Sequence, residues 1–268
     1  MGQASGQPSL PGHGFRARLR RMRNKRYEDW WHIVFGGPVG TLACATIANV
    51  KWITPNGLTW AAFAAKLLGA GLLVVRTRDA DLLACVLLQL NIVLDIMDGS
   101  LARYRARPSA SGAFLDKITD GLGLAFLGTM LGYRATLDGE GIGTLIAGAF
   151  IGMSYLARCY MYWVVAWLEA KQEGAVPTVA APVRGLGELG LRERLGYYLR
   201  STWRIVMVGE GDVYFWIGLF LILGRVHQVV LPLAAAMGFW LVAMFVRRLR
   251  TVYAMDRARE REDEDGAS

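Results

Sequence analysis

Long apolar stretches separated by short polar segments dominate the chain from about residue 53 onward. A helix needs roughly 20 mostly apolar residues to cross the hydrocarbon core of a bilayer, and several of these stretches reach that length. The stretches lie at about 57–76, 82–103, 112–134, 142–168, 212–224 extended by its neighbours, and 227–246. The pattern therefore predicts an all-α integral membrane protein with six transmembrane helices.

The segment 33–52 differs from these stretches. It is interrupted by Gly36, Gly37 and Pro38, it contains Asn49, and tryptophans flank it on both sides. Tryptophan is enriched where a membrane meets water, and amphipathic helices lie in that plane. We expect an N-terminal interfacial amphipathic helix before the first span; a further membrane-spanning helix is the alternative.

These features divide the chain into four parts. We expect a basic N-terminal tail at 1–32, the interfacial juxtamembrane helix at 33–52, a six-helix membrane domain at 53–250 and a charged tail at 251–268. Residues 1–14 are rich in Gly, Pro, Ser and Gln, and residues 256–268 are almost entirely charged or small. Both compositions are typical of disordered or solvated segments.

Composition and charge support a membrane protein and give it an orientation. Hydrophobic residues make up 54% of the chain and the mean hydropathy is +0.30, whereas soluble domains have roughly 45–50% apolar residues. Basic residues gather before the first predicted span, in the loop before the fifth and after the last. With six spans all three groups lie on one side, which the positive-inside rule assigns to the cytoplasm. We therefore expect an inner or cytoplasmic membrane protein with both termini and the site described below on the cytoplasmic side.

The formal net charge of +8 does not indicate nucleic-acid binding. The basic residues flank the predicted spans, so anionic lipid headgroups are their simpler partner. We expect contact with membrane lipid and none with nucleic acid.

Four aspartates interrupt two of the predicted membrane helices: Asp95, Asp98, Asp116 and Asp120. Residues three or four apart share a face of a helix, so each helix can present two carboxylates to one cleft. An unpaired charge in hydrocarbon costs roughly 2.5–3.5 kcal/mol on insertion scales and more by other measures, so these acids require compensating positive charge. The alternative to a metal site is a set of interfacial ion pairs with nearby arginines: Arg103, Arg105 and Arg107.

The ligands of this cluster are oxygen atoms alone, because no His or Cys lies within it. Hard carboxylate ligands suit Mg²⁺ or Mn²⁺ better than Zn²⁺ or copper. Two such ions held by shared carboxylates favour phosphoryl chemistry, because paired cations neutralise a phosphate and assist the attacking and leaving oxygens.

The aspartates also carry a resemblance to a known family. The pattern Asp95-x-x-Asp98-Gly99-x-x-Ala102-Arg103, then eight residues, then Gly112-x-x-x-Asp116-x-x-x-Asp120 resembles the signature of the CDP-alcohol phosphotransferases. The segment 53–59, Ile-Thr-Pro-Asn-Gly-Leu-Thr, is similar to the Pro-Asn-x-x-Thr segment that precedes the first span in that family. Beyond these segments the similarity is one of layout.

The resemblance implies an activity and a division of roles. It implies transfer of a substituted phosphate from a CDP-linked donor, most often CDP-diacylglycerol, to a small polar alcohol, with release of CMP, two Mg²⁺ or Mn²⁺ ions and a homodimer. It implies that Asp95, Asp98 and Asp116 bind metal and that Asp120 is the general base; Asp120 as a further metal ligand stays open. The residues it assigns to binding of the CDP moiety are Asn56, Thr59, Asp98, Gly99, Ala102, Arg103 and Gly112.

The acceptor is not indicated by any comparable motif. Lys66, Arg158 and Arg204 are embedded or juxtamembrane cations that could bind an acceptor phosphate or pair with neighbouring acids. Two alternatives to the main hypothesis stay open: transfer of a CDP-linked polar headgroup (inositol, choline or ethanolamine) to a lipid or soluble alcohol, and a cation-coupled transporter whose intramembrane aspartates bind the ion.

Overall fold

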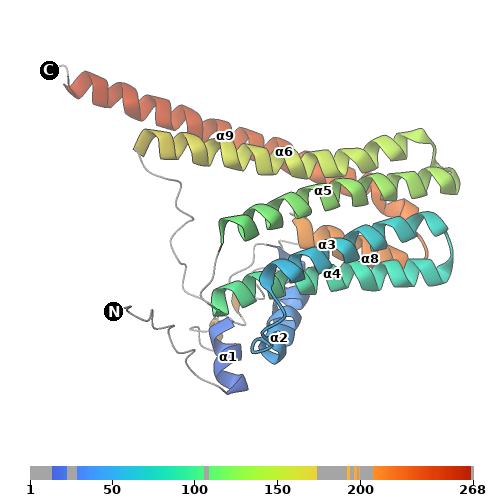
Figure 1. Cartoon of the computed structure of the whole chain (residues 1–268). Helices are drawn as coiled ribbons and strands as arrows, with labels where there is room; N and C mark the ends of the chain where they lie inside the picture. The colour runs from blue at the N-terminus through green and yellow to red at the C-terminus, as the bar shows by residue number, and fades with distance from the viewer. Residues whose placement is uncertain are drawn as a thin grey trace.

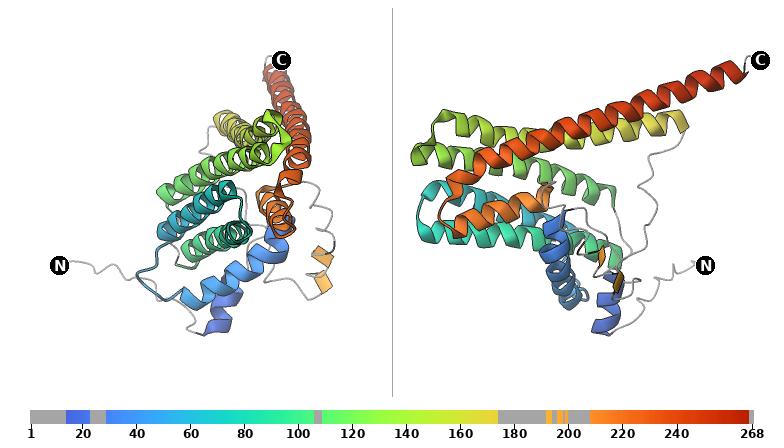
Figure 2. Two further views of the ribbon diagram at one scale, coloured as in Figure 1. Left: turned by 90° about the vertical axis from the view of Figure 1, so that its right-hand side faces the viewer. Right: turned by 180° about the vertical axis from the view of Figure 1, so that it is seen from behind.

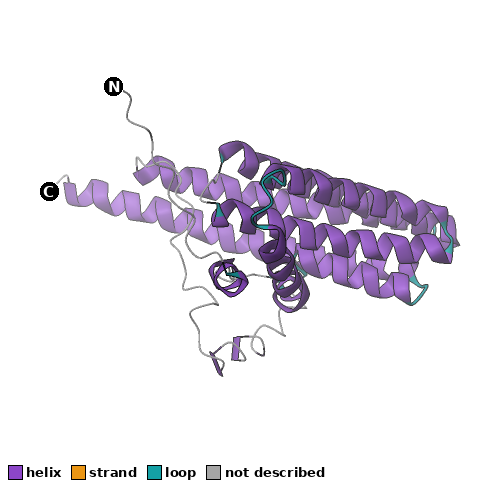
Figure 3. Cartoon of the chain, turned by 60° about the horizontal axis from the view of Figure 1, so that its bottom comes forward, coloured by secondary structure: helices purple, strands orange, loops and turns teal. Residues whose placement is uncertain are grey.

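The computed structural model describes residues 14–22, 29–105, 109–173, 192–193, 196–197, 199 and 208–266. Helices are the regular elements of this part of the chain, and no strand occurs in it (Figure 3). The helices of the bundle are α3 (Pro55–Leu72), α4 (Arg78–Tyr104), α5 (Ala110–Ala135), α6 (Ile142–Glu173), α8 (Glu210–Ile222) and α9 (Val230–Gly266). Successive helices run in opposite directions, and the α3–α4, α5–α6 and α8–α9 connections lie at the same end of the bundle (Figures 1 and 2).

Local sequence signals fix where three of these helices begin. Thr54, Thr77 and Ser109 are extended residues whose side-chain oxygens accept hydrogen bonds from backbone N–H groups of the first turn of α3, α4 and α5. Such N-caps satisfy donors that the helix itself leaves unpaired. Pro55 then occupies the first position of α3, where its missing N–H costs nothing.

The polar end of the bundle opposite the aspartates is closed by one buried ion-pair group. Arg134 Nη1 lies 2.9 Å from Asp81 Oδ1 and donates to the carbonyl of Leu73 at 2.7 Å, while its Nε donates to Asp138 at 2.8 Å. This group ties α3, α4 and α5 together where the chain reverses direction. The turn after Asp138 places Gly139 at a φ of 97°, which glycine adopts without strain.

Two small-residue rows let α5 and α6 approach closely. Gly128 and Gly132 on α5 face Gly148 and Gly152 on α6, and a Cβ added at any of the four would overlap backbone atoms of the facing helix. Rows of small residues four apart are a common packing device between membrane helices. The close pairing fixes α5, which carries Asp116 and Asp120, against α6.

The N-terminal region packs across the end of the bundle that carries the aspartates (Figures 1 and 3). It comprises α1 (Phe15–Met22), a π-helical turn at His32–Gly36 and α2 (Gly37–Ile47). Gly36 and Gly40 admit the side chains of Ile92 and Ile96 of α4, because an added Cβ would lie 2.6–2.9 Å from them. The structure thus has a helix where one was expected at 33–52, ending at Ile47; its amphipathic, interfacial character stays a prediction.

Four described helices are long and apolar enough to cross a membrane: Pro55–Val75, Arg78–Tyr104, Ile142–Lys171 and Val226–Arg257. The expectation of six spans is therefore confirmed for four. In α5 four charged residues interrupt the apolar sequence, and α8 has only 13 residues, so neither qualifies by length and composition. Both nevertheless run alongside the candidate spans (Figure 2).

Of the two expectations for the C-terminal end, disorder was wrong for residues 256–266, which are helical, whereas the exposure of Asp256 and Arg257 agrees with solvation. Helix α9 continues without a break to Gly266 and lies beside α6 beyond the rest of the bundle (Figures 1 and 2). Arg and Glu, which make up much of this segment, are strong helix formers, and the segment continues a helix that is already nucleated within the bundle.

Candidate active site

The aspartates of the motif come from two neighbouring helices at one end of the bundle. Asp95 and Asp98 lie near the C-terminal end of α4, and Asp116 lies near the start of α5. One carboxylate oxygen from each of these three residues lies within 4.8 Å of the other two. Oxygen atoms at this separation can share a divalent cation, and they fit Mg²⁺ or Mn²⁺, which take carboxylate ligands. The donor set of the structure therefore suits the metal that the sequence indicates.

Asp98 is held by a residue of α3. Thr59, which is 4% exposed, donates a hydrogen bond of 2.5 Å from Oγ1 to Asp98 Oδ2. The same hydroxyl also approaches the carbonyl of Pro55 at 3.2 Å. The Pro-Asn-x-x-Thr segment and the aspartate motif thus meet through Thr59 and Asp98.

Asp116 and Asp120 share a cationic neighbour on the outer side. Lys117 Nζ lies 2.9 Å from Asp116 Oδ2 and 3.8 Å from Asp120 Oδ2. Asp116 is partly exposed, whereas Asp120, one turn further along α5, is 7% exposed. Asp116 therefore lies on the exposed side of the site and Asp120 on its buried side.

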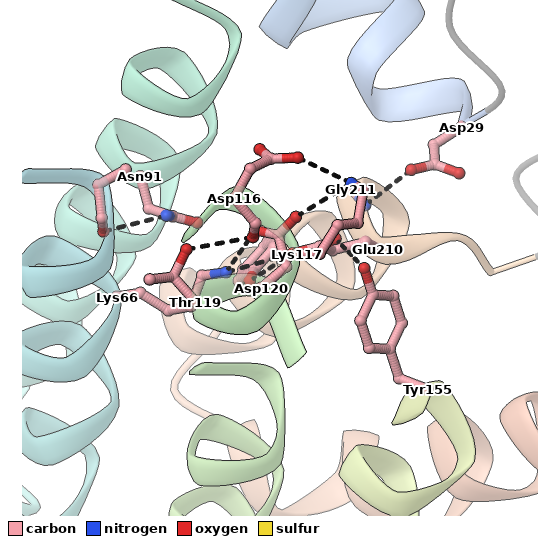
Figure 4. A network of polar contacts seen from close by, with 12 residues as sticks. Asp29, Lys66, Asn91, Asp116, Lys117, Thr119, Asp120, Tyr155, Glu210 and Gly211 are labelled. Carbon is pink, nitrogen blue, oxygen red and sulfur yellow. Dashed lines mark hydrogen bonds and ion pairs between the residues drawn. The ribbon is translucent and has the colours of Figure 1, made fainter. Parts of the chain in front are cut away.

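The floor of the site contains a buried lysine between two acids (Figure 4). Lys66 of α3 is 1% exposed, and its Nζ donates to Asp120 Oδ1 and to Glu210 Oε1, each at 3.3 Å. Glu210 also accepts a hydrogen bond of 2.6 Å from the hydroxyl of Tyr155. Asp120 is therefore connected through Lys66 to the first residue of α8 and, through it, to α6.

Residues assigned to CDP binding lie on both sides of the acids. A Cβ added at Gly112 would lie 3.1 Å from Asn56 Oδ1, so the first turns of α3 and α5 approach each other there. A Cβ added at Gly99 would lie 3.1 Å from Arg103 Nη1, so the guanidinium of Arg103 extends over Gly99. Ala102 is partly exposed on the same helix. These contacts place the small residues beside polar groups; their contact with a nucleotide stays a proposal.

The nearby arginines have partners other than the aspartates. Arg103 Nη2 donates to Ser100 Oγ at 3.2 Å. Arg105 donates to the backbone carbonyls of Ile53 at 2.6 Å and Val50 at 2.8 Å, and so fixes the connection between α2 and α3. Arg107 lies outside the described residues. The geometry of Arg103 and Arg105 therefore favours a metal site over the arginine-paired alternative.

The residues considered for the acceptor are dispersed. Arg158 of α6 donates to the carbonyl of Val208 at 3.4 Å and approaches Met237 Sδ at 3.8 Å. Lys66 has its ammonium between Asp120 and Glu210. Arg204 lies outside the described residues.

The N-terminal region contributes a polar contact just above α8. Asp29 Oδ2 accepts a hydrogen bond from the Gly211 amide at 3.2 Å and lies 3.0 Å from His32 Nδ1. Burial by itself disfavours both charged forms, but the hydrogen bond and charge interaction between the two side chains outweigh it. The pKa of His32 is therefore raised and the pKa of Asp29 is lowered. The pair carries opposite charges and holds the start of the N-terminal helices against α8.

Sequence reasoning missed two members of the site. In the sequence, Glu210 is one of several polar residues before a short apolar helix, and Tyr155 is one of several neighbouring aromatic residues, a pattern typical of packing. The available signal was the acid at the start of an otherwise apolar helix, since such acids need a partner. That the partner is Lys66, 144 residues earlier, follows only from the fold.

Comparison with known proteins agrees with the motif. A model of the CDP-alcohol phosphatidyltransferase family matches residues 52–186, which include both segments of the motif. A search of curated proteins finds no match. The chain belongs to the CDP-alcohol phosphatidyltransferase family, and is accordingly a membrane transferase that moves a phosphoalcohol group from a CDP-alcohol to an acceptor alcohol.

Proposed function

We propose that the chain transfers the phosphatidyl group of CDP-diacylglycerol to the hydroxyl of a small polar alcohol or alcohol phosphate, with release of CMP, in phospholipid biosynthesis. One observation carries the proposal: three carboxylate oxygens from two adjacent helices lie within 4.8 Å of one another inside the family's motif. A coupling-ion site in a transporter also needs acids, but it does not need the nucleotide-transferase motif in which these acids occur.

The proposed metal is Mg²⁺ or Mn²⁺, as two ions held by Asp95, Asp98 and Asp116, with Asp120 as a further ligand in the alternative assignment. Bound cations of this kind neutralise the pyrophosphate of a CDP-linked donor and stabilise the departing CMP. The protein's own contribution is to fix the carboxylates: Thr59 orients Asp98, and the packing of α5 on α6 sets the depth of Asp116 and Asp120.

Asp120 is the proposed general base. A general base must reach the hydroxyl whose proton it removes, and Asp120 lies one turn from Asp116 on the buried side of the acids. In this proposal Asp120 accepts the proton of the acceptor hydroxyl as that oxygen attacks. Asn56, Thr59, Asp98, Gly99, Ala102, Arg103 and Gly112 bind the CDP moiety.

The acceptor side rests on fewer observations. Arg158 and Arg204 are proposed to attract an anionic acceptor, because a guanidinium binds phosphate by paired hydrogen bonds. Lys66 was a third candidate; its two carboxylate partners favour a role toward Asp120 instead.

We also propose the topology and assembly that the sequence indicates. Helices α5 and α8 complete a set of six spans in this proposal, since both run alongside the four candidate spans (Figure 2). The aspartate end faces the cytoplasm, where cytidine nucleotides occur, and the protein is a homodimer in an inner or cytoplasmic membrane.

The experiment that tests the proposal measures CMP release by purified protein with Mg²⁺ or Mn²⁺. Radiolabelled CDP-diacylglycerol is offered with glycerol phosphate, inositol phosphate, inositol or serine, and a second series offers CDP-inositol, CDP-choline and CDP-ethanolamine with alcohol acceptors. We expect CMP and a labelled phospholipid with CDP-diacylglycerol and one acceptor. Turnover only in the second series would replace the proposed donor, and no turnover with any pair would overturn the function.

A further inference from the structure

Lys66 lies in an apolar helix at a depth where a lysine needs a specific partner. It belongs to the candidate span Pro55–Val75, is 1% exposed and has Asp120 and Glu210 within 3.3 Å of its ammonium. A buried cation in a membrane helix is costly unless paired, and such residues usually serve a function. Here one lysine contacts two acids, Asp120 and Glu210. The role of Lys66 is therefore not limited to neutralising a single carboxylate.

Glu210 is fixed independently of Asp120. Its Oε2 accepts from the hydroxyl of Tyr155 at 2.6 Å, and its Oε1 accepts from the hydroxyl of Tyr214 at 3.3 Å and from Lys66. Both oxygens of Glu210 are therefore engaged by groups on α3, α6 and α8. This carboxylate is an anchor that holds the ammonium of Lys66 in one place.

Packing also fixes the stem of Lys66. It crosses α5 at Gly123, where an added Cβ would overlap Lys66 Cδ. A larger residue at 123 would displace the stem and leave every charge of the group in place. The position of the ammonium thus depends on a glycine as well as on the acids.

The fixed position of the Lys66 ammonium bears on the orientation of the Asp120 carboxylate. Its Oδ1 accepts from Lys66, while its Oδ2 lies on the side of Lys117, whose ammonium also contacts Asp116 (Figure 4). Asp120 Oδ1 is thus held by Lys66, and Asp120 Oδ2 lies on the side of Asp116. Because the Asp120 carboxylate is already oriented, it presents Oδ2 to the site. No side-chain entropy is then lost in the reaction step.

We propose that Lys66 is a positioning residue for Asp120, and that Glu210, held by Tyr155, fixes Lys66 in turn. The inference rests on the proposed function, because it assigns the orientation of the proposed general base. It does not require Lys66 to contact either substrate.

The first test replaces Lys66 by methionine, alone and together with Glu210→Gln. The single variant leaves two buried acids without their cation, so reduced folding is expected; the double variant removes one charge of each sign and restores folding.

In both variants, kcat for CMP release falls roughly 10- to 100-fold, the usual effect of losing an outer partner of a functional side chain. The KM for the CDP-linked donor and the Mn²⁺ requirement change by no more than about threefold, because the nucleotide side is intact. Lys51→Met, at an exposed lysine, serves as the control for loss of a positive charge.

A second test keeps all charges and moves the stem. Gly123→Ala displaces Lys66 and lowers kcat with the same small change in KM, whereas Gly71→Ala, on the helix of Lys66 with open space around it, leaves kcat unchanged. This test decides the matter even where the Lys66 variants do not fold.

The outcomes separate the two proposals. Wild-type turnover together with a double variant or a Gly123→Ala variant of unchanged kcat would overturn the role of Lys66 and leave the function standing. An equal loss of donor binding and kcat would show a general collapse of the site and would also overturn it. Absence of CMP release by the wild-type protein would instead overturn the proposed function.

Discussion

Thr59 donates a hydrogen bond to Asp98 across the interface of α3 and α4, with 2.5 Å between the two oxygens. The contact joins the two segments of the family motif through residues that are 39 positions apart in the chain. A hydrogen bond from a neutral hydroxyl orients a carboxylate without neutralising it, as outer partners of metal ligands commonly do. We therefore expect Thr59 to support the proposed metal site as well as to make the CDP contact that the resemblance implies.

Replacing Thr59 by valine tests this role. The variant keeps the shape of the side chain and loses the hydroxyl, so the apparent affinity for Mg²⁺ or Mn²⁺ is expected to fall roughly 10-fold, and saturating metal is expected to restore most of the CMP release. The measurement is a metal titration of CMP release. Thr129→Val is the matched control, because that hydroxyl donates to the carbonyl of Ala125 within its own helix. An unchanged metal requirement would remove Thr59 from the metal site.

Asp116 is the acid that α5 contributes to the group of three oxygens. Asp116→Asn keeps the size of the side chain and removes its charge, and CMP release is expected to fall roughly 100-fold or more, since bound cations supply several kcal/mol of charge stabilisation. The thermal unfolding temperature should change little, because Asp116 is partly exposed and its ion pair is with the exposed Lys117. Asp79→Asn, at an exposed position of α4, is the control. Normal turnover by the Asp116 variant would contradict the metal assignment.

Asp120 should behave differently from Asp116. Asp120 is the proposed general base. Its replacement, Asp120→Asn, is therefore expected to retain binding of Mn²⁺ and CDP, while turnover falls roughly 10²- to 10⁴-fold. Calorimetric titration with CDP in the presence of Mn²⁺ measures binding separately from CMP release. Weakened metal binding in this variant would assign Asp120 to the metal ligands instead.

The contact between Asp29 and His32 makes stability depend on pH. Burial opposes the charged imidazole, but Asp29, and more weakly Asp95 and Glu210, raise its pKa above the ordinary 6.5. A raised histidine pKa gives stabilisation that is complete below about 6.5 and is lost as pH rises through the higher folded-state value. Asp29, whose pKa is lowered from 3.8, contributes above that value and loses its contribution as pH falls further.

We therefore expect the thermal unfolding temperature of the purified protein to decrease between about pH 6 and pH 9, and this decrease to be smaller in His32→Gln. Thermal unfolding measured across that range checks the prediction. Identical profiles for the wild-type protein and His32→Gln would exclude the pair as the cause.

The sequence was sufficient to predict the helical class and the grouping of acids on α4 and α5, because helical periodicity decides which side chains share a face. It was insufficient for the partners of Lys66. Whether Lys66 meets Glu210 depends on how α3 and α8 are placed relative to each other, and no local pattern encodes that. Disorder at the C-terminal end was wrong for a related reason: the charged composition is typical of a disordered or solvated segment, but here the charged residues continue a helix that begins in the bundle.

The packing of α5 on α6 sets the position of the acids, and one glycine tests it. A Cβ at Gly132 would overlap the carbonyl of Thr144 and lie 2.9 Å from Leu145 Cα, and these backbone atoms cannot move as a side chain can. Gly132→Ala is expected to lower stability by about 1–3 kcal/mol, as overpacking of a tight contact does. Gly143→Ala, in the first turn of α6, where the added methyl meets open space, is the control. A separation of α5 from α6 also moves Asp116 and Asp120. We therefore expect both CMP release and the unfolding temperature to fall in Gly132→Ala, and neither to fall in Gly143→Ala. Equal unfolding temperatures for the two variants would show that this glycine row does not hold α5 in place.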